Sequence, residues 1–145
     1  MSGVRLVVAA AILDGTGQVL AAQRAAPPEL AGQWEFPGGK VEDGESEQAA
    51  LVRECREELG VVVRPGQLIA AVPIPGGRLL RLWTAKICSG VPTVSEHLEL
   101  RWVAAAELQA LPWLVPDRPL LTLLEPWLAG RSTGGAAGNV PGRQS

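Results

Sequence analysis

The chain has 145 residues and a formal net charge of −2, which suits one globular domain with a buried core and offers no basic field for polymeric nucleic acid. Hydrophobic residues make up 47% of the sequence, yet no apolar run is long enough to span a bilayer. The two cysteines, Cys55 and Cys88, are too few for a disulfide-stabilised secreted fold and lack metal-ligand spacing. With no convincing signal-peptide cleavage site, these features predict a cytoplasmic protein that binds neither a membrane nor a nucleic-acid polymer.

The first part of the chain predicts strands and loops. Residues 4–13 are rich in β-branched and apolar side chains and end at a turn signature, 14–17. Residues 18–24 form a second strand, so the chain is expected to open with a hairpin. A loop over 25–33, which contains two prolines and a glycine, precedes a short extended piece at 34–36.

From residue 46 onwards the pattern becomes helical. Residues 46–59 carry apolar side chains at helical spacing, and Gly60 stands where a left-handed residue would end the helix. Later segments predict strands at 66–73, 79–87 and 100–103, a helical turn at 105–110 and a final helix at 119–128. Strands and helices mixed in this order predict an α/β fold with a mixed sheet packed between helices.

The domain is predicted to cover residues 1–129, and the segment 130–145 is predicted to be a flexible tail. The tail is rich in Gly, Ser, Thr and Ala and has no apolar periodicity. Such a composition buries too little apolar surface to offset the entropy lost on ordering.

Three glutamates share one face of the predicted helix. Glu54, Glu57 and Glu58 are spaced i, i+3 and i+4. Like charges at this spacing repel by roughly 0.2–0.5 kcal/mol per pair, and a hard divalent cation would relieve that repulsion. Magnesium binds through a few carboxylates and engages substrate phosphates. Taken alone, however, a glutamate-rich face is more often simply solvated.

A glycine-bracketed loop leads directly into this helix. Gly38 and Gly39 begin it, and Glu45 closes it. Glycines let the backbone approach a ligand closely, and a loop carbonyl can join a metal shell. Two adjacent glycines by themselves indicate only an ordinary turn.

Together, the loop and the helix resemble the Nudix box. The match runs from Gly39 through five residues to Glu45, then through seven residues to the run Arg53-Glu54-Cys55-Arg56-Glu57-Glu58-Leu59-Gly60-Val61. Cys55 is the one departure, since the family usually has a bulky aliphatic residue there, and that position packs rather than reacts. The likeness covers about residues 4–128 and is greatest to the MutT-like branch. It implies the Nudix fold, an α/β/α sandwich with a mixed β-sheet.

The resemblance also implies a metal site and a catalytic set. Magnesium, with manganese as a substitute, would be held by the box glutamates and by a loop carbonyl. The implied metal ligands are Gly38, Gly39, Glu54, Glu57, Glu58 and, from a later loop, Glu96, for which Glu99 is the competing candidate. The implied catalytic residues are Glu54, the best candidate for general base, Arg53, which would orient a neighbouring glutamate, and Glu57. Glu45 and His97, the lone histidine, are interpreted as structural.

In MutT-like enzymes water attacks the β-phosphorus of a nucleoside triphosphate and releases a monophosphate and pyrophosphate. The resemblance therefore implies a nucleoside triphosphate as partner, and it leaves monomer and homodimer both open. The implied substrate contacts are Arg24, Glu35, Phe36, Lys40 and Asp117.

Asp117 bears on the choice of base. It stands where MutT has an asparagine that reads 8-oxoguanine. A carboxylate only accepts hydrogen bonds, so it faces the O6 of an oxidised guanine unfavourably but can accept from the amine of cytosine. A similar aspartate occurs in Nudix relatives that cleave CTP, dCTP and 5-methylated cytosine nucleotides. Two other interpretations stay open: a plain helix N-cap, and recognition of the N1 and N2 donors of guanine.

The leading prediction is thus a magnesium-dependent pyrophosphohydrolase of CTP, dCTP or 5-methylcytosine nucleotides. The first alternative is an 8-oxo-dGTP-sanitising diphosphatase. The second is ADP-ribose hydrolysis, because Pro73 and Pro75 lie near a proline typical of that branch. A non-catalytic Nudix binding module is the third, and the complete set of box glutamates disfavours it.

Overall fold

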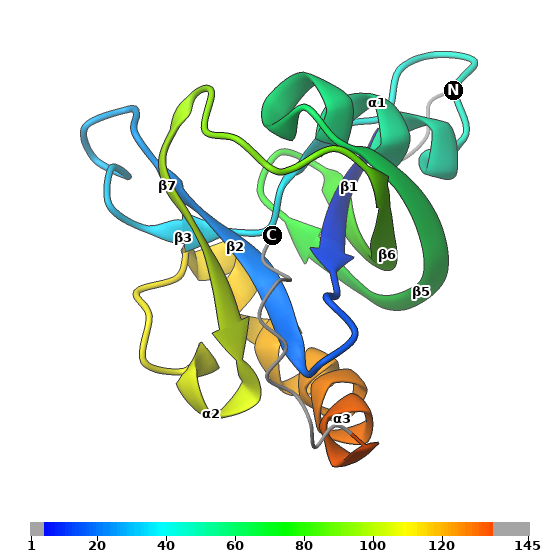
Figure 1. Cartoon of the computed structure of the whole chain (residues 1–145). Helices are drawn as coiled ribbons and strands as arrows, with labels where there is room; N and C mark the ends of the chain where they lie inside the picture. Colours follow the sequence, from blue (N-terminus) through cyan, green and yellow to red (C-terminus); the bar gives the residue numbers. More distant parts are fainter. Residues whose placement is uncertain (1–4, 135–145) are drawn as a thin grey trace.

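The computed structural model of the chain describes residues 5–134, and Figure 1 shows how their strands and helices are arranged. In chain order the elements are β1 (Arg5–Ile12), β2 (Gln18–Arg24), β3 (Trp34–Glu35), β4 (Gly38–Lys40), α1 (Glu47–Leu59), β5 (Val62–Ile74), β6 (Arg78–Ser89), β7 (His97–Ala104), α2 (Ala105–Leu108), a 3-10 turn (Val115–Asp117) and α3 (Arg118–Gly134). None of the helices in this range combines the length and the apolar character that a membrane-spanning helix needs.

The strands form two sheets. One has the order β4-β1-β6-β5 and the other the order β3-β2-β7. β1 runs parallel to β6, whereas the other paired strands are antiparallel. The prediction of an α/β fold with a mixed sheet is confirmed.

The helices cover the sheets from different sides (Figure 1). α1 packs on β1, β4 and β5, and α3 packs on β5. Accordingly there are two apolar cores. One joins α1 side chains such as Leu51 and Leu59 to Val8 and Ile12 of β1, and the other joins α3 to the β-sheets through residues such as Leu124. Alternate residues of β1 enter different cores, as expected for a strand with both faces buried.

Local signals set the limits of α1. The Ser46 side chain accepts a hydrogen bond from the Ala49 backbone N–H at 3.0 Å, which satisfies one of the free donors of the first turn. Gly60 ends the helix in a left-handed conformation (φ 73°) that glycine adopts without a steric cost. Cys55 is fully buried between these ends, and burial raises its pKa to about 12. The interpretation of Cys55 as a packing residue agrees with this placement.

Two expectations about the ends of the domain need correction. The hairpin predicted from 4–13 and 18–24 does not form a two-stranded ladder, because β1 and β2 belong to different sheets and are joined by an isolated bridge between Leu13 and Val19. The last helix continues to Gly134 rather than ending at Leu128. Residues 135–145 of the proposed tail lie outside the described residues, so its flexibility stays a prediction.

Candidate functional site

The glycine loop and α1 meet without a gap. A Cβ atom at Gly39 would overlap the Glu54 carboxyl group, and a Cβ atom at Gly38 would overlap the Val8 carbonyl oxygen on β1. Glycine at both positions therefore lets β4 lie between β1 and the carboxylates of α1. This close approach places loop backbone groups beside Glu54, as a shared metal site would require.

Arg53 binds the loop to the helix through several hydrogen bonds. It forms a bidentate ion pair with the Glu45 carboxylate, at 2.8 and 2.9 Å, and donates a hydrogen bond to the Lys40 carbonyl oxygen at 3.1 Å. Its Nη1 donates to Glu54 Oε2 at 3.0 Å and reaches Glu57 Oε1 at 3.5 Å. The guanidinium lowers the pKa of Glu45 to about 2. Arg53 thus orients Glu54, and Glu45 anchors Arg53, as the structural interpretation of Glu45 expected.

Glu58 carries a carboxylate in an unfavourable position. Its Oε1 is buried and has no hydrogen-bond partner among the described residues. Burial, together with the neighbouring charge of Glu54, raises the pKa of Glu58 to about 8, and the Gly38 backbone N–H offsets this only in part. An unpartnered buried carboxylate oxygen beside a second carboxylate is a donor set that fits a hard divalent cation.

A cavity of about 340 Å³ opens beside Glu58. It is lined by Arg24, Ala25, Ala26, Glu35, Glu58, Glu96 and His97. Glu96 is exposed and comes from the segment before β7. Glu99, its competitor, is instead paired with Arg101 at 3.2 Å. Geometry therefore favours Glu96 over Glu99 as the acid that faces the box.

The implied metal ligands do not all converge. Glu54 and Glu58 lie together over the glycine loop, whereas the Glu57 side chain is 60% exposed and is paired with Arg53 at 3.5 Å. Over residues 5–134, no three Asp, Glu, His or Cys side chains are grouped closely enough to hold a metal ion.

Arg24, Glu35 and His97 form a chain of contacts along the cavity. Arg24 Nη1 lies 3.2 Å from Glu35 Oε1, and His97 Nε2 lies 2.9 Å from Glu35 Oε2. A shift in the β2–β7 register at Gln23 and Arg24 brings Arg24 opposite His97. The sequence interpretation assigned His97 no place in the site. Its position next to Glu96 was the available signal.

Asp117 is buried, with 7% of its surface exposed, and points toward β3. Its Oδ2 accepts the Phe36 backbone N–H at 3.0 Å, and the Phe36 ring packs against Trp113 with centroids 4.8 Å apart. Burial raises the pKa of Asp117 to about 7, opposed by the Phe36 N–H and by Arg24. The side-chain bond goes to Phe36 and not to the first turn of α3, so the N-cap interpretation does not describe this residue.

The other residues predicted to contact substrate lie in different places. Glu35 lies in the cavity wall, and Phe36 is buried with its N–H bound to Asp117. Lys40 is exposed at the end of β4, and its carbonyl oxygen is held by Arg53.

The burial of Asp117 predicts an effect of pH on stability. The unfolded chain loses this proton near its ordinary pKa of 3.8, whereas the folded chain keeps it up to about 7. The folded state therefore binds more protons in that window, and stability falls as pH rises from about 4 to 7. Asp117→Asn keeps an acceptor for the Phe36 N–H. At pH 8 we expect its free energy of unfolding to exceed that of the wild type by on the order of 2 kcal/mol.

Denaturant unfolding at pH 5 and pH 8 measures this difference. The advantage of Asp117→Asn is expected to shrink at pH 5. A variant that is less stable than the wild type at both pH values would show that Asp117 is not strained by burial.

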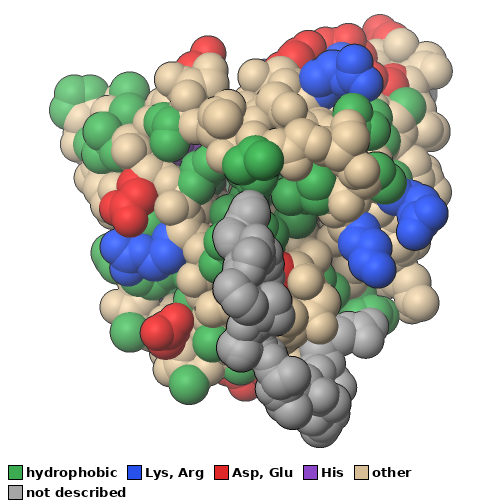
Figure 2. Space-filling model, viewed as in Figure 1, with side chains coloured by type: hydrophobic (Ala, Val, Ile, Leu, Met, Phe, Trp, Pro, Cys, Tyr) green, Lys and Arg blue, Asp and Glu red, His purple; other side chains and the backbone are tan. Residues whose placement is uncertain are grey.

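Acidic side chains gather at the end of the molecule that carries α1, whereas Lys and Arg are scattered over the same face (Figure 2).

Comparisons with known proteins agree with the geometry. Residues 3–124 match the NUDIX domain. A protein of Mycobacterium tuberculosis provisionally named 8-oxo-dGTP diphosphatase 2 is 43% identical over 94% of this chain and 95% of its own length.

CTP pyrophosphohydrolase of Escherichia coli is 42% identical over 79% of this chain and 87% of its own length. The solution structure of the E. coli ORF135 protein superposes with a TM-score of 0.72, at 38% identity, over 92% of this chain and 95% of that one. The chain therefore belongs to the Nudix family of hydrolases, in its MutT-like branch.

Proposed function

We propose that this protein is a magnesium-dependent nucleoside triphosphate pyrophosphohydrolase that favours cytosine nucleotides. The observation that carries the hydrolytic part is the Glu54–Glu58 pair, packed on Gly38 and Gly39 beside the cavity that Arg24 lines. The names of the M. tuberculosis and E. coli relatives support a nucleoside triphosphate as the substrate class.

The residues that would hold magnesium are Glu54, Glu57 and Glu58, with a carbonyl of Gly38 or Gly39 and with Glu96 from the cavity wall. When bound, the ion neutralises charge on phosphate oxygens and makes a water molecule more acidic. Nudix hydrolases generally need a divalent metal, and manganese is the expected substitute. The orphaned oxygen of Glu58 is the structural feature that supports this assignment.

Glu54 is proposed as the general base. Its Oε2 is held by Arg53 at 3.0 Å, so the carboxylate has a fixed orientation over the glycine loop. It would take a proton from the attacking water as the water oxygen bonds to the β-phosphorus. The bond from that phosphorus to the oxygen bridging to the α-phosphate would break, which releases a monophosphate and pyrophosphate. A positioned base of this kind contributes about 10²–10⁴-fold.

Arg24 is proposed to contact the phosphates. Its guanidinium lines the cavity with Glu35, and the Glu35–His97 contact on the other side of that carboxylate keeps Glu35 in place. A guanidinium has several donors and only some of those of Arg24 are used by Glu35 and by the Ala26 carbonyl. The remaining donors can meet a phosphate oxygen.

Asp117 carries the proposal about the base. One of its oxygens binds the Phe36 N–H, which fixes the carboxyl group close to the Phe36–Trp113 pair. The other oxygen remains as an acceptor that suits the exocyclic amine of cytosine. Binding such a donor would also favour the charged form of a carboxyl whose pKa burial has raised.

A second candidate, 8-oxo-dGTP hydrolysis, has its own support. The M. tuberculosis relative is named for that substrate. Because the pKa of Asp117 is about 7, part of the population carries a neutral carboxyl at neutral pH, and its O–H can donate to the O6 of an oxidised guanine.

The test is Asp117→Asn, assayed on dCTP and on 8-oxo-dGTP. Asparagine keeps the shape but can present an N–H donor to the ring. The misdirected hydrogen bond is expected to cost on the order of 1–3 kcal/mol, about 5- to 150-fold in kcat/KM for dCTP. Activity on 8-oxo-dGTP is expected to hold or rise, so the ratio of the two kcat/KM values is the quantity to measure.

Asp117→Ala serves as the control. If Asp117 only supports the Phe36 backbone, alanine lowers stability and lowers both activities alike. A ratio for Asp117→Asn within a factor of two of the wild type would remove Asp117 from base selection and leave the hydrolytic proposal standing.

A further inference from the structure

A second, larger cavity lies away from the carboxylate site. Its volume is about 440 Å³, and its lining includes Arg64, Pro65, Gln67, Thr84, Lys86 and Trp127. It shares no lining residue with the cavity beside Glu58. Its size falls in the range of about 300–1,000 Å³ typical of small-molecule sites.

An irregular stretch of β5 lines this cavity. The β5–β6 register shifts between Pro65 and Leu68. Within that stretch the Gln67 backbone N–H donates to Thr84 Oγ1 at 2.9 Å, and Thr84 is buried. A Cβ atom at Gly66 would overlap Thr84 Oγ1, so glycine is required for this close approach. The floor of the cavity is thus fixed by specific contacts.

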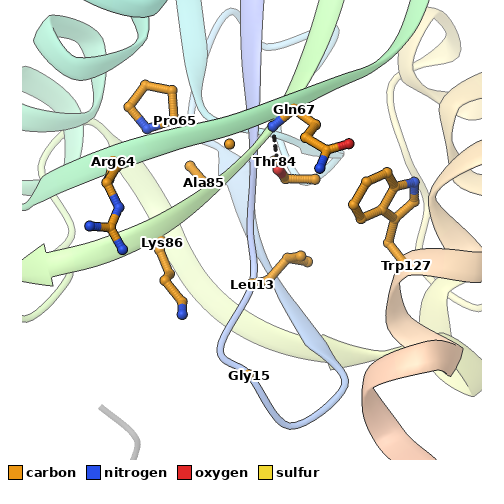
Figure 3. A pocket seen from close by; sticks show the side chains of 10 residues that line it. Leu13, Gly15, Arg64, Pro65, Gln67, Thr84, Ala85, Lys86 and Trp127 are labelled. Atoms are coloured by element: carbon orange, nitrogen blue, oxygen red, sulfur yellow. Dashed lines mark hydrogen bonds between the residues drawn. The ribbon is translucent and has the colours of Figure 1, made fainter.

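Two cations stand at one end of the cavity without a neutralising partner in its lining. Arg64 and Lys86 are directly opposite each other on β5 and β6, and both are exposed. Like charges in this arrangement are destabilising, and none of the described residues that line the cavity is acidic. In Figure 3 both charged groups extend to the same side of the strands. An anion bound between them would relieve the repulsion.

An aromatic side chain stands at the other end. Trp127 comes from α3 and is half-buried. Figure 3 shows its indole across the cavity from Arg64 and Lys86, with the Gln67 side chain between the two ends. An indole face suits stacking with a flat ring, and the Gln67 amide can both donate and accept.

We propose that this cavity is a second ligand site, for a phosphate monoester joined to a planar heterocyclic ring, as in a nucleoside 5′-monophosphate. The phosphate would lie between Arg64 and Lys86, and the ring would pack on Trp127. The separation of the charged and aromatic ends selects a ligand with both features over a bare anion.

The test is titration of the full chain without added metal, followed by NMR of backbone amides and indole N–H groups. The probes are AMP, inorganic phosphate and adenosine. AMP is expected to shift the Trp127 indole and the amides of Arg64 and Lys86 in a saturable way. Inorganic phosphate is expected to shift only the amides of Arg64 and Lys86 and to bind at least tenfold more weakly than AMP. Adenosine is expected to shift the Trp127 indole and to bind more weakly than phosphate.

Variants separate this site from general charge effects. The double variant Arg64→Gln/Lys86→Gln, which removes a repulsive pair and is expected to fold, should weaken AMP binding at least tenfold. Arg5→Gln removes an exposed cation at the far end of β1 and should leave the affinity for AMP unchanged. Equal weakening by both variants would overturn the proposal. So would shifts confined to Arg24, Glu35 and His97, or no saturable shift at Trp127.

Discussion

Replacing Glu58 with glutamine is expected to remove most of the turnover and to leave the domain at least as stable as before. The amide has the same shape but is a poor magnesium ligand. We expect kcat to fall about 10³-fold, beyond the 10–100-fold typical of residues that only support metal ligands. Stability should hold or rise because the variant replaces a buried acid, whose ionised form is disfavoured by burial and by the charge of Glu54, with a neutral amide.

The opposite directions of the two effects make this variant informative. Asp43→Asn is the matched control, since Asp43 is an exposed acid in the adjoining loop and its loss changes net charge equally. Near-normal kcat for Glu58→Gln under saturating magnesium would exclude Glu58 from the metal site. A large loss of stability would contradict the strained carboxylate described for the folded protein.

Glu57→Gln is expected to lower kcat several hundred-fold with the fold intact. Its carboxylate is exposed and within reach of Arg53 Nη1 at 3.5 Å, which also binds Glu54. If Glu57 is one of the proposed magnesium ligands, a neutral amide in its place removes a negative charge that the ion requires. The measurement is kcat as a function of magnesium concentration, with melting temperature as the check on folding.

A weaker role for Glu57 gives a different result. If Glu57 only helps to orient Arg53, its loss removes one contact of 3.5 Å and leaves the shorter ones to Glu45 and Glu54. Turnover would then fall by about tenfold or less, the lower end for outer partners of a metal site. Such a small loss, with unchanged magnesium dependence, would place Glu57 outside the metal shell.

The elements closest to the box could be predicted because their signals are local. Ser46 and Gly60 bracket α1 in the sequence as in the structure, and the helical spacing of the glutamates needs no tertiary information. Glycine at 38 and 39 likewise predicted a close approach of the backbone to other groups. In the structure, Val8 and Glu54 occupy the space that side chains at these two positions would need.

What could not be predicted depends on contacts between distant segments. The partner of Asp117 is the Phe36 backbone, 81 residues earlier, so an aspartate before a helix was open to interpretation as a cap. The hairpin prediction failed because a turn signature fixes a reversal of the chain but not whether both strands enter the same sheet. The Glu35–His97 pair spans 62 residues and has no local pattern.

The pair of cations across the second cavity from Trp127 could not be predicted from the sequence either. Arg64 and Lys86 become neighbours only through the β5–β6 register, and that register contains irregularities that no propensity predicts. A small molecule site built on such irregularities is a property of the folded sheet, whereas the Nudix box is a property of the chain.

We propose that Glu54 and Glu58 support magnesium-dependent attack of water on a nucleoside triphosphate, and the products of the reaction distinguish this from other cleavages. CTP is incubated in water labelled with a heavy oxygen isotope, with and without magnesium, and the products are identified by phosphorus NMR and mass spectrometry. We expect CMP and pyrophosphate only when magnesium is present, with the label in pyrophosphate. Formation of CDP and phosphate, or no turnover of any canonical or oxidised nucleoside triphosphate with magnesium, would contradict it.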